Sequence, residues 1–138
     1  MKSHSEHGYL LIFRGTDWHK GLSPEEMQRV FNDWMAWFER HRRAGRVAGG
    51  NPLENEGKVV TGGGAQGSVV ADGPFAESKE AIGGYFLLTV RTEAEALAIA
   101  RECPGLPHGV MVEVRPIAGL CEAGQEVARE RESTALTA

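Results

Sequence analysis

The segment from Asp72 to Glu80 places turn residues, an aromatic ring and a run of charges at fixed offsets, in the order Asp-Gly-Pro-Phe-Ala-Glu-Ser-Lys-Glu. Asp-Gly-Pro is ordinary turn chemistry, since an aspartate side chain accepts hydrogen bonds from the backbone amides that follow it. A functional interpretation stands beside this one. Asp72 would lie at the mouth of a cavity, where burial raises the pKa of its carboxyl group and suits it to act as a base. Phe75 is then a candidate substrate contact.

Four further residues are candidates for the same site. His108 precedes the last predicted strand, and a loop that enters a cavity-facing strand can carry a group that titrates near neutrality. Glu113 and Arg115 share one strand face, which favours an ion pair within or between subunits. Alternatively, Arg115 anchors an anionic substrate, because its guanidinium matches a carboxylate in a bidentate manner. Tyr85, on the preceding strand, is a candidate substrate contact.

The sequence contains no recognisable cofactor or metal motif. Gly62–Gly67 matches the dinucleotide pattern G-x-G-x-x-G, but that motif requires a helix after the last glycine, and here the β-branched stretch Ser68–Val70 follows. The phosphate-loop lysine, the nucleophile elbow and the H-E-x-x-H zinc pattern are absent from the sequence. Cys103 and Cys121 lack C-x-x-C spacing, so neither zinc nor a disulfide framework is expected. We therefore predict neither a cofactor nor a metal.

Hydrophobic periodicity and turn residues predict the elements that must position these side chains. The predicted strands are residues 8–14, 47–53, 58–61, 68–71, 84–90 and 109–117, and helices follow Ser23 and Thr92. The order of strand, helix, glycine-rich hairpin region, strand, helix and strand is that of a split β-α-β unit. It predicts an α+β fold of the ferredoxin-like βαββαβ type, with an antiparallel sheet, an extra hairpin and two helices on one face.

Both predicted helices begin with the residues of a capping box, Ser23 with Glu26 and Thr92 with Glu95. The first helix is expected to end at Gly45, which can adopt the left-handed conformation. We interpret the apolar residues of this helix as one core stripe, composed of Met27, Val30, Phe31, Trp34, Trp37, Phe38 and His41. His41, at the end of the stripe, is expected to pack or cap rather than to catalyse.

Alternation along the last predicted strand assigns its two faces. The valines at 110, 112 and 114 suit the helix side, whereas Met111, Glu113 and Arg115 point to the opposite side. Two helices cover only one face of such a sheet, so the other face needs a partner. We expect a homodimer, or a higher oligomer, formed through this face, and an enclosed cavity between the sheet and its partner.

Composition excludes several classes of partner. The 138 residues hold 15 lysines and arginines against 19 acidic residues, a net charge of −4, and no basic stripe, which argues against nucleic acid. The longest apolar run, Tyr9–Phe13, is too short for a membrane span or a signal-peptide core. The two unpaired cysteines suit a reduced, cytoplasmic chain. One domain is expected over residues 8–118, between a flexible N-terminus (1–7) and a polar tail (119–138) that is a weak helix or disordered.

Glycine makes up 18 of the residues, and eleven of these lie between Gly45 and Gly84. Most of them punctuate the predicted hairpins. Gly83 and Gly84 stand instead at the start of a predicted strand, where they permit a bulge or the close approach of a ligand or a partner backbone. This pair is therefore a candidate cavity wall.

Three stretches resemble the DGPF-domain proteins of the YCII-related family: Asp72–Glu80, Ile82–Phe86, and Gly109 with Glu113–Ile117. The resemblance runs from about residue 8 to residue 117, and it includes the stretch 44–53. It implies a dimeric ferredoxin-like α+β barrel, bacterial and cytoplasmic, often encoded near sigma factors of the extracytoplasmic-function class, without a settled activity. Some relatives are thought to pair a histidine early in the first helix with an aspartate. Here Glu25–Gln28 occupies that place, so a site in this chain is expected to use Asp72 with His108 or Arg115.

These observations leave three hypotheses. In the first, a small cofactor-independent enzyme binds or transforms a compact anionic or aromatic metabolite inside the barrel, with Asp72 as base and Arg115 as anchor. In the second, the chain is a non-enzymatic ligand-binding or partner-binding accessory protein linked to sigma-factor regulation. In the third, the sheet face makes the dimer and binds nothing else.

Overall fold

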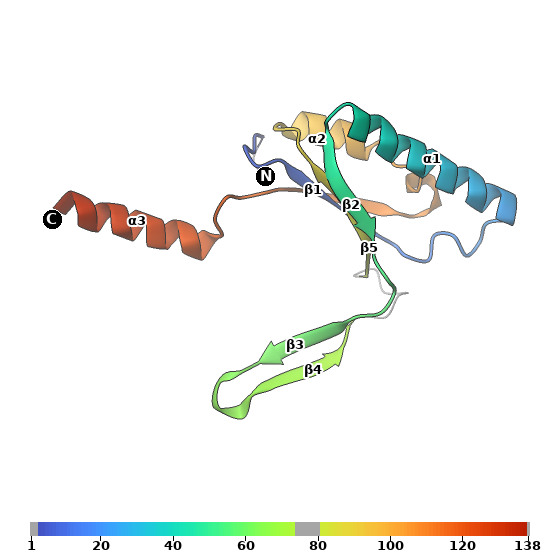
Figure 1. Cartoon of the computed structure of the whole chain (residues 1–138). Coiled ribbons are helices and arrows are strands. Elements are labelled where there is room, and N and C mark those ends of the chain that lie inside the picture. Colours follow the sequence, from blue (N-terminus) through green and yellow to red (C-terminus); the bar gives the residue numbers. More distant parts are fainter. Residues whose placement is uncertain (1–2, 74–80, 138) are drawn as a thin grey trace.

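The computed structural model describes residues 3–73 and 81–137. Their elements in chain order are β1 (Tyr9–Arg14), α1 (Pro24–Arg43), β2 (Val47–Pro52), β3 (Lys58–Gly62), β4 (Ser68–Asp72), β5 (Ile82–Leu88), α2 (Glu93–Ala100), β6 (Met111–Pro116) and α3 (Glu122–Thr137), with short 3₁₀ turns η1 (Gly64–Gln66) and η2 (Leu106–His108). Four strands form one antiparallel sheet, and β3 pairs with β4 in a separate two-stranded sheet. The predicted α+β class, the antiparallel sheet and the extra hairpin are confirmed (Figure 1).

The four-stranded sheet has the strand order β2-β5-β1-β6, and every neighbouring pair is antiparallel. In the centre, Leu11 stands opposite Phe86 on one side and Val114 on the other. Tyr9, Leu11 and Phe13 alternate with half-buried residues along β1, because successive side chains point to opposite faces. Helices α1 and α2 lie on the face that these three residues share (Figure 1). The opposite face, called the open face below, is not covered by any helix of the described residues (Figure 1).

Helix α1 begins as its sequence predicts. The Ser23 hydroxyl accepts from the Glu26 amide, and the Glu26 carboxylate accepts from the Ser23 amide, which completes the capping box. Gly45, just past the helix end, has a φ of +76°. At the start of α2, Thr92 accepts from the Glu95 amide, but the Glu95 carboxylate accepts from the Thr92 hydroxyl instead of its amide. The second cap is thus half of the predicted box.

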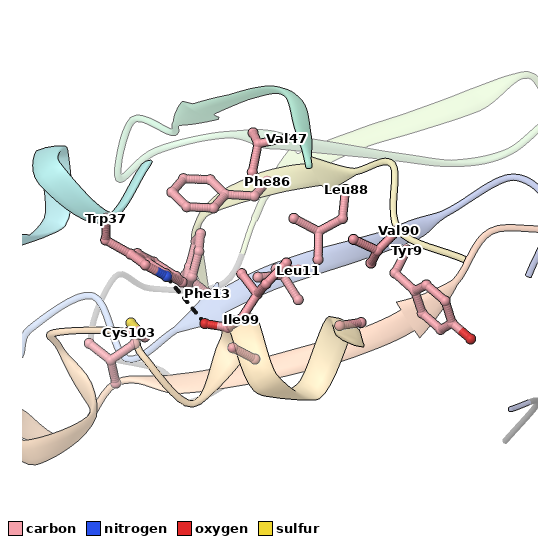
Figure 2. Packing of buried hydrophobic residues seen from close by; sticks show 13 residues of the cluster. Tyr9, Leu11, Phe13, Trp37, Val47, Phe86, Leu88, Val90, Ile99 and Cys103 are labelled. Carbon is pink, nitrogen blue, oxygen red and sulfur yellow. Dashed lines mark hydrogen bonds between the residues drawn. The ribbon is translucent and has the colours of Figure 1, made fainter. Parts of the chain in front are cut away.

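Trp37 is the largest fully buried side chain of the core. It packs among residues of the sheet and of α2, and its Nε1 donates a hydrogen bond to the Ile99 carbonyl oxygen over 3.2 Å (Figure 2). The predicted stripe of α1 does not lie entirely in this core. Val30 is buried like Trp37, whereas Met27 is 37% and Phe31 is 60% exposed. The reason is that Phe31 lies over a cavity rather than over packed side chains.

His41 is buried at the end of α1 and joins three segments of the chain. Its Nε2 donates to a Glu102 carboxylate oxygen 2.6 Å away, just beyond α2, and its Nδ1 accepts from Arg46 Nε over 2.8 Å. An arginine Nε can only donate, so Nδ1 is the acceptor of this hydrogen bond. The interpretation of His41 as a packing residue is confirmed.

Two elements extend away from this body (Figure 1). Strands β3 and β4 form a ribbon in which every residue is exposed, and glycines turn the chain at its tip. Gly62–Gly67 therefore belongs to a hairpin, as expected, and not to a nucleotide loop. Helix α3 follows β6 and is exposed along most of its described length.

Replacing Trp37 is expected to loosen both helices at once. Trp37→Ala removes a buried ring and the hydrogen bond to Ile99, so the free energy of unfolding should fall by about 3–5 kcal/mol. Urea denaturation followed by circular dichroism measures this change. The control is Gln28→Ala on the exposed side of the same helix, for which a change within about 0.5 kcal/mol is expected. Equal effects of the two substitutions would contradict this account of the core.

The contact between Glu102 and His41 predicts a pH dependence of stability. Partial burial alone raises the pKa of Glu102, but the hydrogen bond from His41 and the electrostatic interactions with His41 and Arg40 lower it below the ordinary value of 4.5. A carboxyl whose pKa is lower in the folded chain stabilises the fold above its unfolded pKa, and this stabilisation is lost as the pH falls through the folded pKa. Glu102→Gln should therefore flatten the acid limb of stability against pH, measured by urea denaturation below about pH 5. Glu126→Gln on exposed α3 is the control and should leave that limb unchanged.

Candidate functional site

A cavity of about 320 Å³ lies between α1 and the sheet. The loop between β1 and α1 closes one side of it, and the adjoining ends of β2 and β5 form its floor. Its wall is composed of Phe13, Arg14, Gly15, Thr16, Trp18, Phe31, Trp34, Met35, Phe38, Gly50, Asn51, Pro52, Gly83, Gly84, Phe86 and Val110. The wall is mainly aromatic and aliphatic, as in most small-molecule sites.

Aromatic rings in the wall contact one another directly. Trp18 stacks on Trp34 with ring centroids 6.1 Å apart and planes inclined by 22°. Phe13 makes edge-to-face contacts with Trp34 at 5.2 Å and with Phe86 at 4.9 Å. Such contacts hold the rings in fixed orientations, since aromatic pairs favour stacked and edge-on geometry. The cavity therefore has a firm aromatic side formed by the sheet, the loop and α1.

Glycines make the floor of the cavity flat. A Cβ atom at Gly50 would lie 2.6 Å from the Tyr85 carbonyl oxygen, and one at Gly84 would lie 2.8 Å from the Asn51 carbonyl oxygen. Strands β2 and β5 thus approach too closely for side chains at these positions. Gly83 and Gly84 line this cavity, whereas the cavity expected from the sequence lies between the sheet and a partner. This cavity lies on the helix side of the sheet, within one chain.

Three of the residues proposed from the sequence lie on the open face of the sheet. Glu113 accepts from Arg14 over 3.2 Å, and Arg115 lies 3.7 Å from the other carboxylate oxygen of Glu113. Tyr85 accepts a hydrogen bond from the Asn51 side-chain amide over 3.1 Å. The sequence analysis gave two interpretations of Glu113 and Arg115, and the ion pair is the one that the structure contains. Arg14 on β1 joins the same ion pair.

The other proposed residues lie elsewhere. Asp72 ends β4 on the ribbon, where its carboxylate is 83% exposed and bonded to Lys58. His108 ends the turn η2 on the helix side, with its ring centroid 6.3 Å from that of Trp18. Phe75 lies outside the residues that the structure describes.

The structure does not bring Asp72, His108 and Arg115 together. None of the three lines the cavity beneath α1, and none lines a second one, of about 370 Å³, at the base of the ribbon. They occupy the ribbon, the helix side and the open sheet face respectively. In a single chain, the expected position of Asp72 at the mouth of a cavity is not found, because β4 pairs with β3 and leaves the sheet.

Sequence reasoning missed the residues that form the cavity. Trp18 lies in the loop before α1, and its large ring within a polar stretch is a signal that this loop folds back on the body. Phe31 and Met35 were assigned to the core or left aside, since helical periodicity gives the face of a side chain but not what lies beneath it. The exposed fraction of Phe31, 60%, shows the difference.

Among residues 3–73 and 81–137 there is no cluster of three or more histidine, cysteine or carboxylate side chains arranged to bind a metal. Burial, only partly offset by hydrogen bonds from backbone amides, raises the pKa of the Cys103 thiol to about 11, so this cysteine is a core residue rather than a nucleophile. None of the helices within those ranges is both long and apolar enough to cross a membrane.

Comparison with known proteins agrees with the resemblance seen in the sequence. An uncharacterised protein of Rhizobium meliloti (strain 1021) is 35% identical over 98 residues, which cover 70% of this chain and 79% of that protein. The family model of the YCII-related domain matches residues 9–118, a range that begins at β1, ends just after β6 and contains the entire cavity wall. The chain therefore belongs to the YCII-related family.

Proposed function

We propose that this protein binds a small, uncharged aromatic compound in the cavity beneath α1, without a cofactor. The observation that carries the proposal is the wall itself, in which six aromatic side chains surround about 320 Å³: Phe13, Trp18, Phe31, Trp34, Phe38 and Phe86. This volume is at the lower end of the roughly 300–1,000 Å³ of small-molecule sites. A planar ring can stack on the Trp18 and Trp34 pair or insert beside it.

The charges around the cavity favour a neutral ligand over an anionic one. Among the described residues of the wall, one side chain carries a charge, that of Arg14. Its guanidinium is bonded to Glu113 on the open face. A carboxylate in the cavity would lose water without gaining a free cation, which is costly in an apolar site. Thr16 adds a neutral hydroxyl to the wall, whereas the side-chain amide of Asn51 is bonded to Tyr85, and the remaining side chains of the wall other than Arg14 are apolar. These favour an aromatic ring with at most one polar substituent.

The geometry supports binding more than catalysis. Within the described wall there is no carboxylate, histidine or cysteine to move a proton. Asp72, His108 and Arg115 would act as base, acid or anchor only if a second chain placed one of them next to another, since they lie on three separate parts of one chain. We therefore assign the cavity a binding role.

We further propose that the chain has the ferredoxin-like arrangement and forms a homodimer through its open sheet face. Leu10 and Ile12 are half-buried there, and Leu87 and Met111 are 37% and 46% exposed. A contiguous apolar sheet face next to an ion-pair network suits a self-complementary interface, in which the same patch meets itself across a two-fold axis. The strand order β2-β5-β1-β6 with all neighbours antiparallel supports the ferredoxin-like arrangement.

The ligand proposal is tested with a matched pair of probes, neutral indole and anionic indole-2-carboxylate. Isothermal titration calorimetry should show saturable binding of indole and at least tenfold weaker binding of the carboxylate. Met35→Trp, which fills the half-exposed mouth, should weaken indole binding at least tenfold, because the larger ring occupies the space of the ligand.

Met27→Trp is the control for this substitution, since Met27 lies two turns earlier on the same helix and outside the wall. It should leave indole binding unchanged. Equal binding of indole by both variants, or tighter binding of the carboxylate than of indole, would refute the assignment of the cavity.

Sedimentation equilibrium tests the proposed dimer. Arg115→Glu places two carboxylates beside each other on the open face of each copy, so its repulsion acts twice in a symmetric interface. The dissociation constant should rise at least tenfold. Arg29→Glu on exposed α1 makes the same charge change on the helix side and should not alter it. A wild-type chain that is monomeric at all concentrations would rule out the dimer.

A further inference from the structure

The ribbon of β3 and β4 exposes apolar side chains on both of its faces. Val60 and Val70 stand opposite each other on one face and are 64% and 61% exposed. Val59 and Val69 lie on the other face and are 42% and 60% exposed. In Figure 1 the ribbon lies below the four-stranded sheet, on the side away from α1 and α2.

A ribbon of this kind is not stable by itself. An isolated two-stranded hairpin is marginal at best in water, and it needs a third strand or a packed face. Every residue of β3 and β4 is exposed, so the body of the same chain covers neither face. The charged groups within its strands are Lys58 and Asp72, which pair with each other at the base. The other side chains of the two strands are four valines and Ala71, with Thr61 and Ser68 as the polar exceptions.

The same chain carries a surface that matches the ribbon. The open sheet face is apolar at Leu87 and Met111, and it carries Arg14 and Arg115, which both interact with Glu113. The segment that leads into the ribbon is acidic and exposed at Glu54 and Glu56. The valines of the ribbon match the apolar residues of the sheet face, and the acidic segment is opposite in charge to the side chains of Arg14 and Arg115.

The area of the sheet face is a second argument for a further contact between the two copies. Four strands of about six residues cover roughly 20 by 20 Å, or about 400 Å². A standard stable interface buries about 800 Å² on each partner. A dimer made by the sheet faces alone has a small footprint, and two ribbons, one from each copy, would enlarge it where each packs on the part of the partner's sheet face that the sheet-to-sheet contact leaves uncovered.

We propose that the ribbon is an arm that packs its valines on the open sheet face of a second copy of this chain, with Glu54 and Glu56 next to the arginines of that copy. Two-fold symmetry makes the contact reciprocal, so each chain gives one arm and receives one. The proposal rests on the proposed dimer and adds to it the element that completes the interface. It is independent of what the cavity binds.

Cross-linking between two differently tagged chains tests the contact. One chain carries Val60→Cys and the other Leu87→Cys, both with Cys121→Ser, which removes the exposed native thiol. The buried Cys103 thiol, with a pKa of about 11, reacts slowly. After mixing and treatment with a short bismaleimide, the cross-linked pair of unlike tags should dominate. A pairing of Val60→Cys with Gln28→Cys, on the helix side, should form at least fivefold less product.

A second measurement uses Val60→Thr with Val70→Thr, which keeps the shape and the β propensity of the ribbon. The dimer dissociation constant should rise at least tenfold, whereas Val127→Thr on exposed α3 should not change it. A dimer that persists in the double variant and gives no arm-to-sheet cross-link would overturn the arm and leave the sheet-face dimer standing. A monomeric wild type would overturn both, and indole binding, measured separately, would be untouched by either result.

Discussion

The rest of the structure depends on one constraint, which is that α1 is attached to α2 through only the C-terminal half of α1. Helix α1 has 20 residues and α2 has eight, so α1 is longer by about 18 Å. The hydrogen bond from Trp37 to Ile99 and the bonds of His41 fix the C-terminal half of α1. Beneath the middle of α1, from Phe31 to Phe38, the aromatic cavity takes the place of packed core.

The elements follow from local signals, and the sequence analysis located them for that reason. Ser23 starts α1 by bonding to amides three residues away, and Gly45 ends it through its own backbone freedom. The glycine-rich turn at Gly62–Gly67 similarly depends on neighbouring residues alone. Alternation assigned the faces of β6 correctly, because the period of a strand is fixed by its geometry.

The candidate site depends instead on contacts between distant parts of the chain. Arg14 and Glu113 are 99 positions apart in the sequence, and the pairing of β1 with β6 brings them into contact. This register cannot be read from the sequence. The turn chemistry of Asp72 favours a place at the mouth of a cavity between the sheet and a partner, but within one chain β4 pairs with β3 in a sheet of its own. Trp18 joins the wall because its loop folds back on α1. Periodicity and turn chemistry carry no information about such encounters.

The glycines of the floor determine which residues of the cavity wall can be substituted without disturbing the fold. A side chain at Gly50 or Gly84 would push β2 and β5 apart, so that floor is bound to the integrity of the sheet. The opposite wall, with Phe31 and Met35, is half in solvent on a helix whose fold does not depend on them. For the binding role that we propose for this cavity, a change of ligand preference would therefore come from substitutions on the helix side rather than on the sheet side. The sheet-side wall maintains the fold, whereas the helix-side wall can change without disturbing it.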